Sequence, residues 1–171
     1  MGFFSKEIRT MDELFIHTLR DIYYAEQNIL QALPTMIEDS ANSKLRLAFE
    51  HHLAESQNHV SRVEQVFDMC DAERKAVNCP AIDGIIKEAK EVAGDVPVED
   101  EAVLDAALIA AAQAVEHYEI ARYGSLIAWA RALGREDCAN ILQQNLAEEK
   151  AADKKLTEIA ESAVNAQASA A

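Results

Sequence analysis

Apolar residues recur at alternating steps of three and four along four long stretches of the chain, the spacing of one face of an α-helix. These stretches cover about residues 11–38, 44–70, 98–133 and 136–163. The chain has only five glycines and three prolines in 171 residues. A β-protein of this length needs many more turn residues. The sequence therefore predicts an all-α fold.

Two short breaks and one long connection separate the four helices. Residues 39–43 form one short break, and Gly134 and Arg135 form the other. Short breaks join helices that run antiparallel as neighbours, whereas the connection over about residues 71–97 is long enough to cross the molecule. This order predicts a four-helix bundle of ferritin-like connectivity, with one long crossover that carries a short extra helix.

The crossover and the chain end have their own local signals. A short helix is expected to begin at Pro80 and to close at Gly94, with Pro97 just beyond it. The last residues of the chain show no helical periodicity. We therefore expect one ferritin-like domain over residues 1–164 and a disordered C-terminal tail over residues 165–171.

Every long helix carries at least one carboxylate where a bundle core would have an apolar side chain. These carboxylates fall at matched distances from the two short breaks, near the middle of each helix. Several ionised groups cannot share a dry core without a cation, because desolvation and mutual repulsion both raise their pKa. A pair of divalent ions resolves this conflict, and carboxylate-rich sites suit iron or manganese. The predicted ligands are Glu26, Glu55, Glu116, Glu119 and Glu149.

Two histidines and one aspartate join the list of candidate metal ligands. His52 and His59 lie one turn before and one turn after Glu55 on the same helix face, so either can ligate a metal while the other holds a ligand by a hydrogen bond. Asp153, one turn after Glu149, can ligate, orient a histidine or face water. In the alternative interpretation, the carboxylates form ion pairs with arginines and bind no metal. The candidate partners are Arg20, Arg46, Arg62 and Arg122.

Charge and cysteine content exclude several classes of function. Sixteen Lys and Arg against thirty Asp and Glu give a net charge of −14. Such a surface repels nucleic-acid phosphates and anionic membranes. No run of about 18 apolar residues exists to span a membrane. Three cysteines without a CxxC spacing argue against a disulfide framework, so we expect a cytoplasmic protein.

Five segments resemble the YciE/YciF family of bacterial ferritin-like stress proteins: residues 21–26, 52–56, 79–89, 106–124 and 148–157. The alanine-rich segment that ends in E-H-Y-E is the most specific of them. The resemblance implies a homodimeric ferritin-like bundle with a dinuclear site similar to rubrerythrin-type centres. By position, the family's acidic ligands would be Glu26, Glu55, Glu116, Glu119 and Glu149, with Asp153 and His52 beside them.

One departure from the wider ferritin superfamily concerns the histidine ligand. The usual Glu-x-x-His pair is absent; His52-x-x-Glu55 reverses it and Glu55-x-x-x-His59 lengthens it. The identity of the histidine ligand, and with it ferroxidase competence, therefore stays open at this point.

Three functions remain open from the sequence. The first is a dinuclear metalloenzyme, an oxidoreductase acting on hydrogen peroxide or dioxygen. The second is a non-catalytic metal-binding protein, and the third is a structural or interaction bundle. Nucleotide-binding and hydrolytic motifs are absent from the sequence. Metal content separates the third function from the first two, and turnover of peroxide separates the first from the second.

Overall fold

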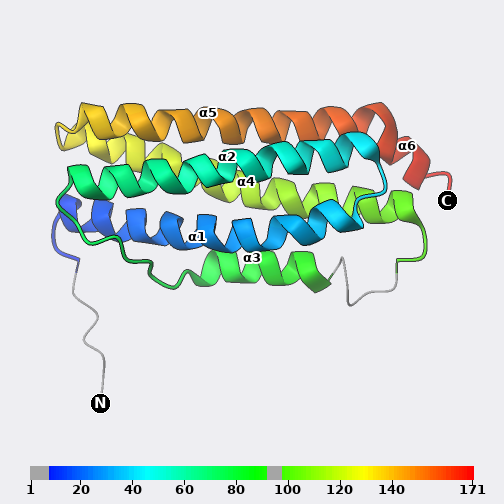
Figure 1. The fold of residues 1–171 in the computed structure, drawn as a ribbon, viewed down its shortest axis with the longest axis horizontal. Helices are drawn as coiled ribbons and strands as arrows, with labels where there is room; N and C mark the ends of the chain where they lie inside the picture. Colours follow the sequence, from blue (N-terminus) through cyan, green and yellow to red (C-terminus); the bar gives the residue numbers. More distant parts are fainter. Residues whose placement is uncertain (1–7, 92–97) are drawn as a thin grey trace, which may run out of the picture.

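The computed structural model describes residues 8–91 and 98–171, and all the regular structure in these two ranges is helical. Four long helices form a bundle: α1 (Met11–Asp39), α2 (Ser43–Met69), α4 (Glu101–Ala132) and α5 (Glu136–Ile159). The shorter α3 (Pro80–Lys90) lies outside the bundle, along α1 and α4 (Figure 1). The all-α prediction is confirmed.

The connectivity is also as predicted. Short turns pair α1 with α2 and α4 with α5, and α2 packs on α5 while α1 packs on α4. The long crossover between the two hairpins carries α3 (Figure 1). The predicted helix end at Gly94 and the following Pro97 lie outside the described residues. No helix in the described ranges is long and apolar enough to cross a membrane.

Polar caps explain where the helices begin. The Thr10 hydroxyl accepts a hydrogen bond from the Glu13 N–H at 3.1 Å, and the Glu13 carboxylate accepts one from the Thr10 N–H at 3.2 Å. Asn42 and Asp100 cap α2 and α4 in the same way, with side-chain oxygens that accept from backbone N–H groups of the first turn. Gly134 has a φ of 72° and turns the chain from α4 to α5.

The C-terminal segment differs from the sequence-based expectation. A π-helical turn (Ala160–Val164) follows α5, and a short helix, α6 (Asn165–Ala168), follows that turn. The prediction that the chain is without structure from residue 165 is wrong for α6. Val164 is fully buried and this segment packs against α4, so tertiary burial extends the helix beyond the last visible periodicity.

A buried aspartate ties the first hairpin to α4. Asp105 accepts hydrogen bonds from the backbone N–H groups of Ala41 at 3.0 Å and Asn42 at 2.8 Å, through its two carboxylate oxygens. These N–H groups belong to the turn between α1 and α2 and have no partner within a helix. Asp105 therefore fixes one end of the bundle, a contact that the sequence pattern did not reveal.

Candidate metal centre

The middle of the bundle holds a cluster of ionisable side chains that water scarcely reaches. The six members come from all four long helices and are Glu26, His52, His59, Glu116, Glu119 and Glu149. Their neighbours along each helix are the apolar core residues, such as Ile22 and Ile29 on α1. The convergence that the sequence predicted is therefore present in the structure.

The six side chains form two overlapping groups. His52, Glu116, Glu119 and Glu149 each offer one ligand atom, and these atoms lie within 4.8 Å of one another. Glu26, His59 and Glu149 form a second group by the same measure. Glu149 belongs to both groups. Each group could hold a metal ion, and the two groups share the carboxylate of Glu149.

Close contacts join the histidines to the carboxylates. His59 Nδ1 lies 2.8 Å from Glu149 Oε1 and 3.3 Å from Glu26 Oε1. His52 Nε2 lies 3.3 Å from Glu116 Oε1, and its Nδ1 lies 3.9 Å from Glu149 Oε2. Each histidine thus contacts carboxylates from two other helices, which places both rings, and not one of them, at the centre.

Burial and crowding shift the protonation of the cluster. Burial, followed by the charge of Glu149, raises the pKa of Glu116 and of Glu119 well above the usual carboxyl range. Burial lowers the pKa of His59, but its contacts with Glu149 and Glu26 outweigh that effect and raise it to about 11. Burial raises the pKa of Glu149, and the contact with His59 reverses this and lowers it. Without a metal, protons balance the charge.

Many polar atoms of the cluster lack a hydrogen-bond partner, which tests whether a metal fits. They are Glu26 Oε2, Glu116 Oε2, both carboxylate oxygens of Glu119 and of Glu149, both ring nitrogens of His52, and His59 Nδ1. The histidine–carboxylate contacts given above are ion pairs whose geometry does not make a hydrogen bond. Buried polar atoms without partners are costly, so their concentration in one place requires an explanation. Carboxylate oxygens with two imidazoles are a donor set that suits iron or manganese, and a dinuclear centre fits this cluster.

A set of outer contacts orients the donors. The His59 Nε2 lies 2.8 Å from Glu148 Oε2, and Arg62 binds the same carboxylate at 2.6 and 3.0 Å. This contact directs the His59 Nδ1 toward the cluster, as outer partners of metal-binding histidines do. The Tyr123 hydroxyl donates to Glu26 and accepts a hydrogen bond at 2.9 Å from the Asn145 side-chain amide.

Glu148 is a site residue that the sequence interpretation missed. Arg62 was considered there as a partner for a core carboxylate, but in the structure it pairs with Glu148. The sequence feature that points to Glu148 is its position next to Glu149 on α5, together with Arg62 and His59 on the facing helix α2. Adjacent helical residues point about 100° apart, so one glutamate faces the core and the other faces the neighbouring helix edge.

Glu55 and Asp153 do not join either group, in contrast to the prediction. The Glu55 side chain is 20% exposed. Its Oε2 lies 3.1 Å from His51 Nδ1, on the outer side of α2, and farther, at 4.0 Å, from His52 Nδ1. The inward position on α2 is taken by Ser56, which is fully buried. Between His52 and His59, the buried face of α2 passes through Ser56, four residues after His52. Glu55, three residues after His52, lies beside this face.

Asp153 lies at the edge of the α4–α5 contact. Its carboxylate accepts a hydrogen bond at 2.9 Å from the Gln113 side-chain amide and lies 3.3 Å from His117 Nε2. It is 24% exposed, so partial hydration and this amide satisfy it without a metal. Of the three roles predicted for Asp153, the structure therefore favours contact with a histidine, His117, at a half-buried position.

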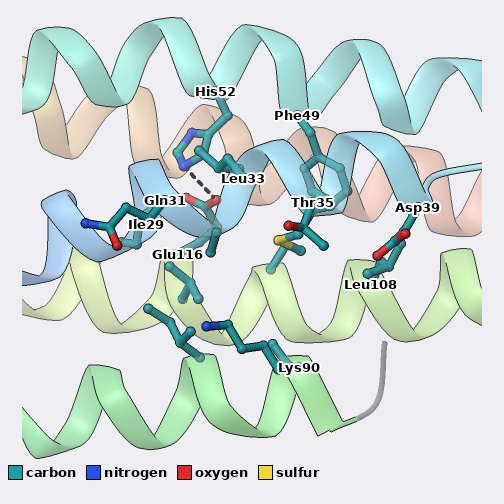
Figure 2. A pocket seen from close by; sticks show the side chains of 16 residues that line it. Ile29, Gln31, Leu33, Thr35, Asp39, Phe49, His52, Lys90, Leu108 and Glu116 are labelled. Atoms are coloured by element: carbon teal, nitrogen blue, oxygen red, sulfur yellow. Dashed lines mark ion pairs between the residues drawn. The ribbon is translucent and has the colours of Figure 1, made fainter. Parts of the chain in front are cut away.

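Two hollows lead from the surface to His52 and Glu116. One, of about 150 Å³, opens between α1, α2, α3 and α4 (Figure 2). The other, of about 500 Å³, opens between α2 and α5, and its lining includes Glu55, His51 and the lysines Lys44 and Lys155. The cluster is thus buried yet accessible to small molecules.

The bundle and its buried carboxylate–histidine cluster define a ferritin-like protein. The chain belongs to the family described as a domain of unknown function (DUF892), whose model matches residues 10–169. Protein YciF of Escherichia coli strain K12 is 43% identical over 162 residues, which cover 94% of this chain and 96% of that protein. The family resemblance seen in the sequence is therefore confirmed.

Solved structures agree with this assignment. The crystal structure of the E. coli stress protein YciF matches with a TM-score of 0.87 at 43% identity, over 92% of this chain and 99% of that one. YcfI of Rhodopseudomonas palustris, for which a structural role has been put forward, matches with a TM-score of 0.86 at 56% identity, over 91% and 98%. A protein of Xanthomonas campestris at 22% identity shares the fold, with a TM-score of 0.71 over 92% and 95%.

Proposed function

We propose that this chain binds two divalent transition-metal ions, iron or manganese, and acts with them on hydrogen peroxide or dioxygen in a bacterial stress response. The observation that carries the proposal is the position of Glu149 in two buried groups of donor atoms at once. A single structural ion pair does not need a shared carboxylate, and it does not leave so many buried polar atoms without partners. The stress context comes from the related E. coli protein.

The donors divide naturally between two ions. Glu26, His59 and Glu149 would hold one ion, and the other would be held by His52, Glu116, Glu119 and Glu149. A bound pair of iron or manganese ions would supply the redox chemistry, giving two electrons to one molecule of hydrogen peroxide and regaining two from a second, which leaves as dioxygen. Carboxylates on four different helices make the folded bundle a prerequisite for binding.

The chain's own residues prepare this site. Glu148 and Arg62 hold the His59 ring so that its Nδ1 faces inward. The Tyr123 hydroxyl holds one oxygen of Glu26 by a hydrogen bond, which leaves the other oxygen free of protein partners. The apolar walls keep bulk water away, and the hollow between α2 and α5 gives small oxidants access to His52 and Glu116.

Metal content is the first test of the proposal. We expect about two ions per chain after aerobic loading with Fe(II) or Mn(II) and desalting, measured by elemental analysis together with the electronic spectrum. If the protein holds no metal after this treatment, the proposal is wrong. Turnover of hydrogen peroxide by loaded protein then supports an oxidoreductase, whereas metal uptake without turnover leaves the second candidate, a non-catalytic metal-binding protein.

A structural or interaction bundle is the remaining candidate function. The similarity to YcfI of Rhodopseudomonas palustris favours it, because a structural role has been put forward for that protein. Failure to bind metal, combined with an unchanged fold after the cluster is replaced by apolar residues, would select this function.

We further propose that the protein acts in the cytoplasm as a homodimer. Cys70, Cys79 and Cys138 are all free thiols, as is usual in a reducing compartment. The homodimer follows from the family resemblance. Light scattering coupled to size-exclusion chromatography tests it, with an expected mass twice the 18.9 kDa of the chain.

A further inference from the structure

The hollow beneath α3 reaches His52 and Glu116 between a different set of helices from the lysine-lined hollow between α2 and α5. Its walls come from α1, α2, α3 and α4, and the side chains along them are mainly apolar: Ile29, Leu33, Phe49, Ile86, Leu108 and Val115. Figure 2 shows His52 of α2 and Glu116 of α4 facing each other in this hollow, joined by their ion pair. A hydrated ion gains nothing from such walls, whereas an apolar molecule does.

The inner end of this hollow is formed by the ion pair of His52 with Glu116, and several atoms of this pair make no hydrogen bond. Glu116 and His52 are both buried, and their closest approach to each other is 3.3 Å, between Oε1 and Nε2. Glu116 Oε2 and both nitrogens of His52 have no hydrogen-bond partner in the structure. A ligand that enters the hollow therefore meets apolar contacts along its length and one polar contact at its tip.

The size of the hollow limits the ligand. Its volume is about 150 Å³, and an apolar cavity of that order holds a molecule of about the size of benzene. Besides His52 and Glu116, the lining carries one charged residue of each sign, Asp39 on α1 and Lys90 on α3 (Figure 2). These two charges balance, so selection of the ligand falls to the apolar walls.

We propose that this hollow, which we call the α3 pocket, binds a small organic molecule with an apolar body and a single polar end. The apolar body lies between Phe49, Leu33 and Leu108, and the polar end faces His52 and Glu116. This site goes beyond the proposed function, because the contacts come from the chain and need no metal. It places an organic molecule beside the cluster, in a hollow distinct from the lysine-lined one.

Two ring compounds of equal size test the pocket. Phenol and toluene differ by one polar group, so we would titrate each into metal-free and metal-loaded full-length protein by calorimetry. Both are expected to bind the metal-free protein, and phenol about tenfold more tightly, since its hydroxyl donates to Glu116. Absence of binding by either compound up to its solubility overturns the proposal.

Matched variants on α3 locate the binding. Ala89 lines the pocket and Ala81 is an exposed residue of the same helix outside it. Ala89→Phe fills the pocket and is expected to raise both dissociation constants by about tenfold or more, whereas Ala81→Phe leaves them within about twofold. Circular dichroism and melting curves show that both variants fold. Equal affinity of the Ala89→Phe variant and the wild type overturns the site.

A third variant tests the polar end. Glu116→Leu removes the acceptor and keeps a side chain of similar volume, so toluene is expected to bind and the advantage of phenol is expected to disappear. A phenol preference that survives Glu116→Leu overturns the assignment of the polar end. Failure of the wild type to take up Fe(II) or Mn(II) would contradict the proposed metal function and leave the result on metal-free protein intact.

Discussion

At the scale of single residues, the shared position of Glu149 decides how the cluster behaves. It contacts His59 from one group and lies among His52, Glu116 and Glu119 in the other. An apolar residue would be the normal occupant of this seam position. A leucine at this position would supply apolar packing, whereas Glu149 supplies carboxylate oxygens.

Replacing Glu149 by leucine tests this balance. Metal binds the folded arrangement alone, and an excess of one hundred times Kd stabilises the wild type by about 2.7 kcal/mol. Glu149→Leu is expected to lose most of this gain, and its metal-free form is expected to be less stable than the wild type, because the buried His59 loses its carboxylate partner at 2.8 Å. Thermal melting with chelator and with Mn(II) measures both effects.

The matched control is Glu158→Leu on the same helix. Glu158 is exposed and pairs only loosely with Lys154 and Lys155, at 3.9 and 4.0 Å. This control should keep the full metal-dependent shift in melting temperature. If Glu149→Leu gains as many degrees from Mn(II) as the control does, Glu149 is no ligand.

The thiols at one end of the bundle give a second test at this scale. Cys70 and Cys138 lie with their sulfur atoms 4.0 Å apart. Burial raises the pKa of Cys70, and burial together with Cys70 raises the pKa of Cys138 to about 12. The reactive thiolate of Cys138 therefore forms only in strongly alkaline solution, and that of Cys70 forms less readily than in an exposed cysteine.

Alkylation by iodoacetamide at about pH 8 measures this shift. The two thiols of the native protein should react at least about tenfold more slowly than the same residues in urea, as followed by peptide mass spectrometry. Equal rates in the native and unfolded protein would show that the pKa values are not raised.

At the scale of helices, the sequence pattern and the structure agree where local physics dominates. Heptad spacing placed four helices and identified Glu26, Glu116, Glu119 and Glu149, because a carboxylate in an apolar stripe is visible without knowing the partner helices. Spacing cannot separate Glu55 from Ser56, since steps of three and four both stay on one helix face. Glu148 depends on a facing helix and could not be placed from the sequence.

Asp105 is a contact between elements that no local pattern predicts, since its partners are 63 and 64 residues away. Asp105→Ala leaves two backbone N–H groups of the α1–α2 turn without their acceptors. We expect it to lower the free energy of unfolding by about 1–3 kcal/mol, and Asp105→Asn to lower it by less. Urea denaturation measures both. Equal losses for the two variants would contradict the hydrogen-bonding role.

At the scale of the whole molecule, the cluster couples stability to pH. The pKa values of His59, Glu116 and Glu119 are raised in the folded protein. At a pH above the pKa that each group has in the unfolded chain, which is 6.5 for His59, the folded protein therefore holds more protons than the unfolded chain. Stability from these groups is therefore lost as pH rises. Glu149, whose pKa is lowered, is ionised in both states in this range and contributes no slope.

Bound metal takes the place of these protons and removes their effect. Metal-free protein should melt at lower temperature at about pH 9 than at about pH 6, and the gain from Mn(II) should grow over the same range. Melting curves at matched ionic strength measure both trends. A gain that is constant with pH would show that metal binding releases no protons.

The hydrogen bonds of Asp105 also set the longitudinal alignment of α4. Glu116 follows Asp105 by eleven residues, which is about 16 Å along a helix. Two helices that pack only through apolar ridges can slide by one turn at modest cost, whereas an anchor at a fixed distance from the carboxylates forbids that slide. Asp105 therefore fixes the axial position of Glu116 relative to the other helices. Inserting or deleting one helical turn between these two residues would leave a well-packed bundle whose four carboxylates no longer meet.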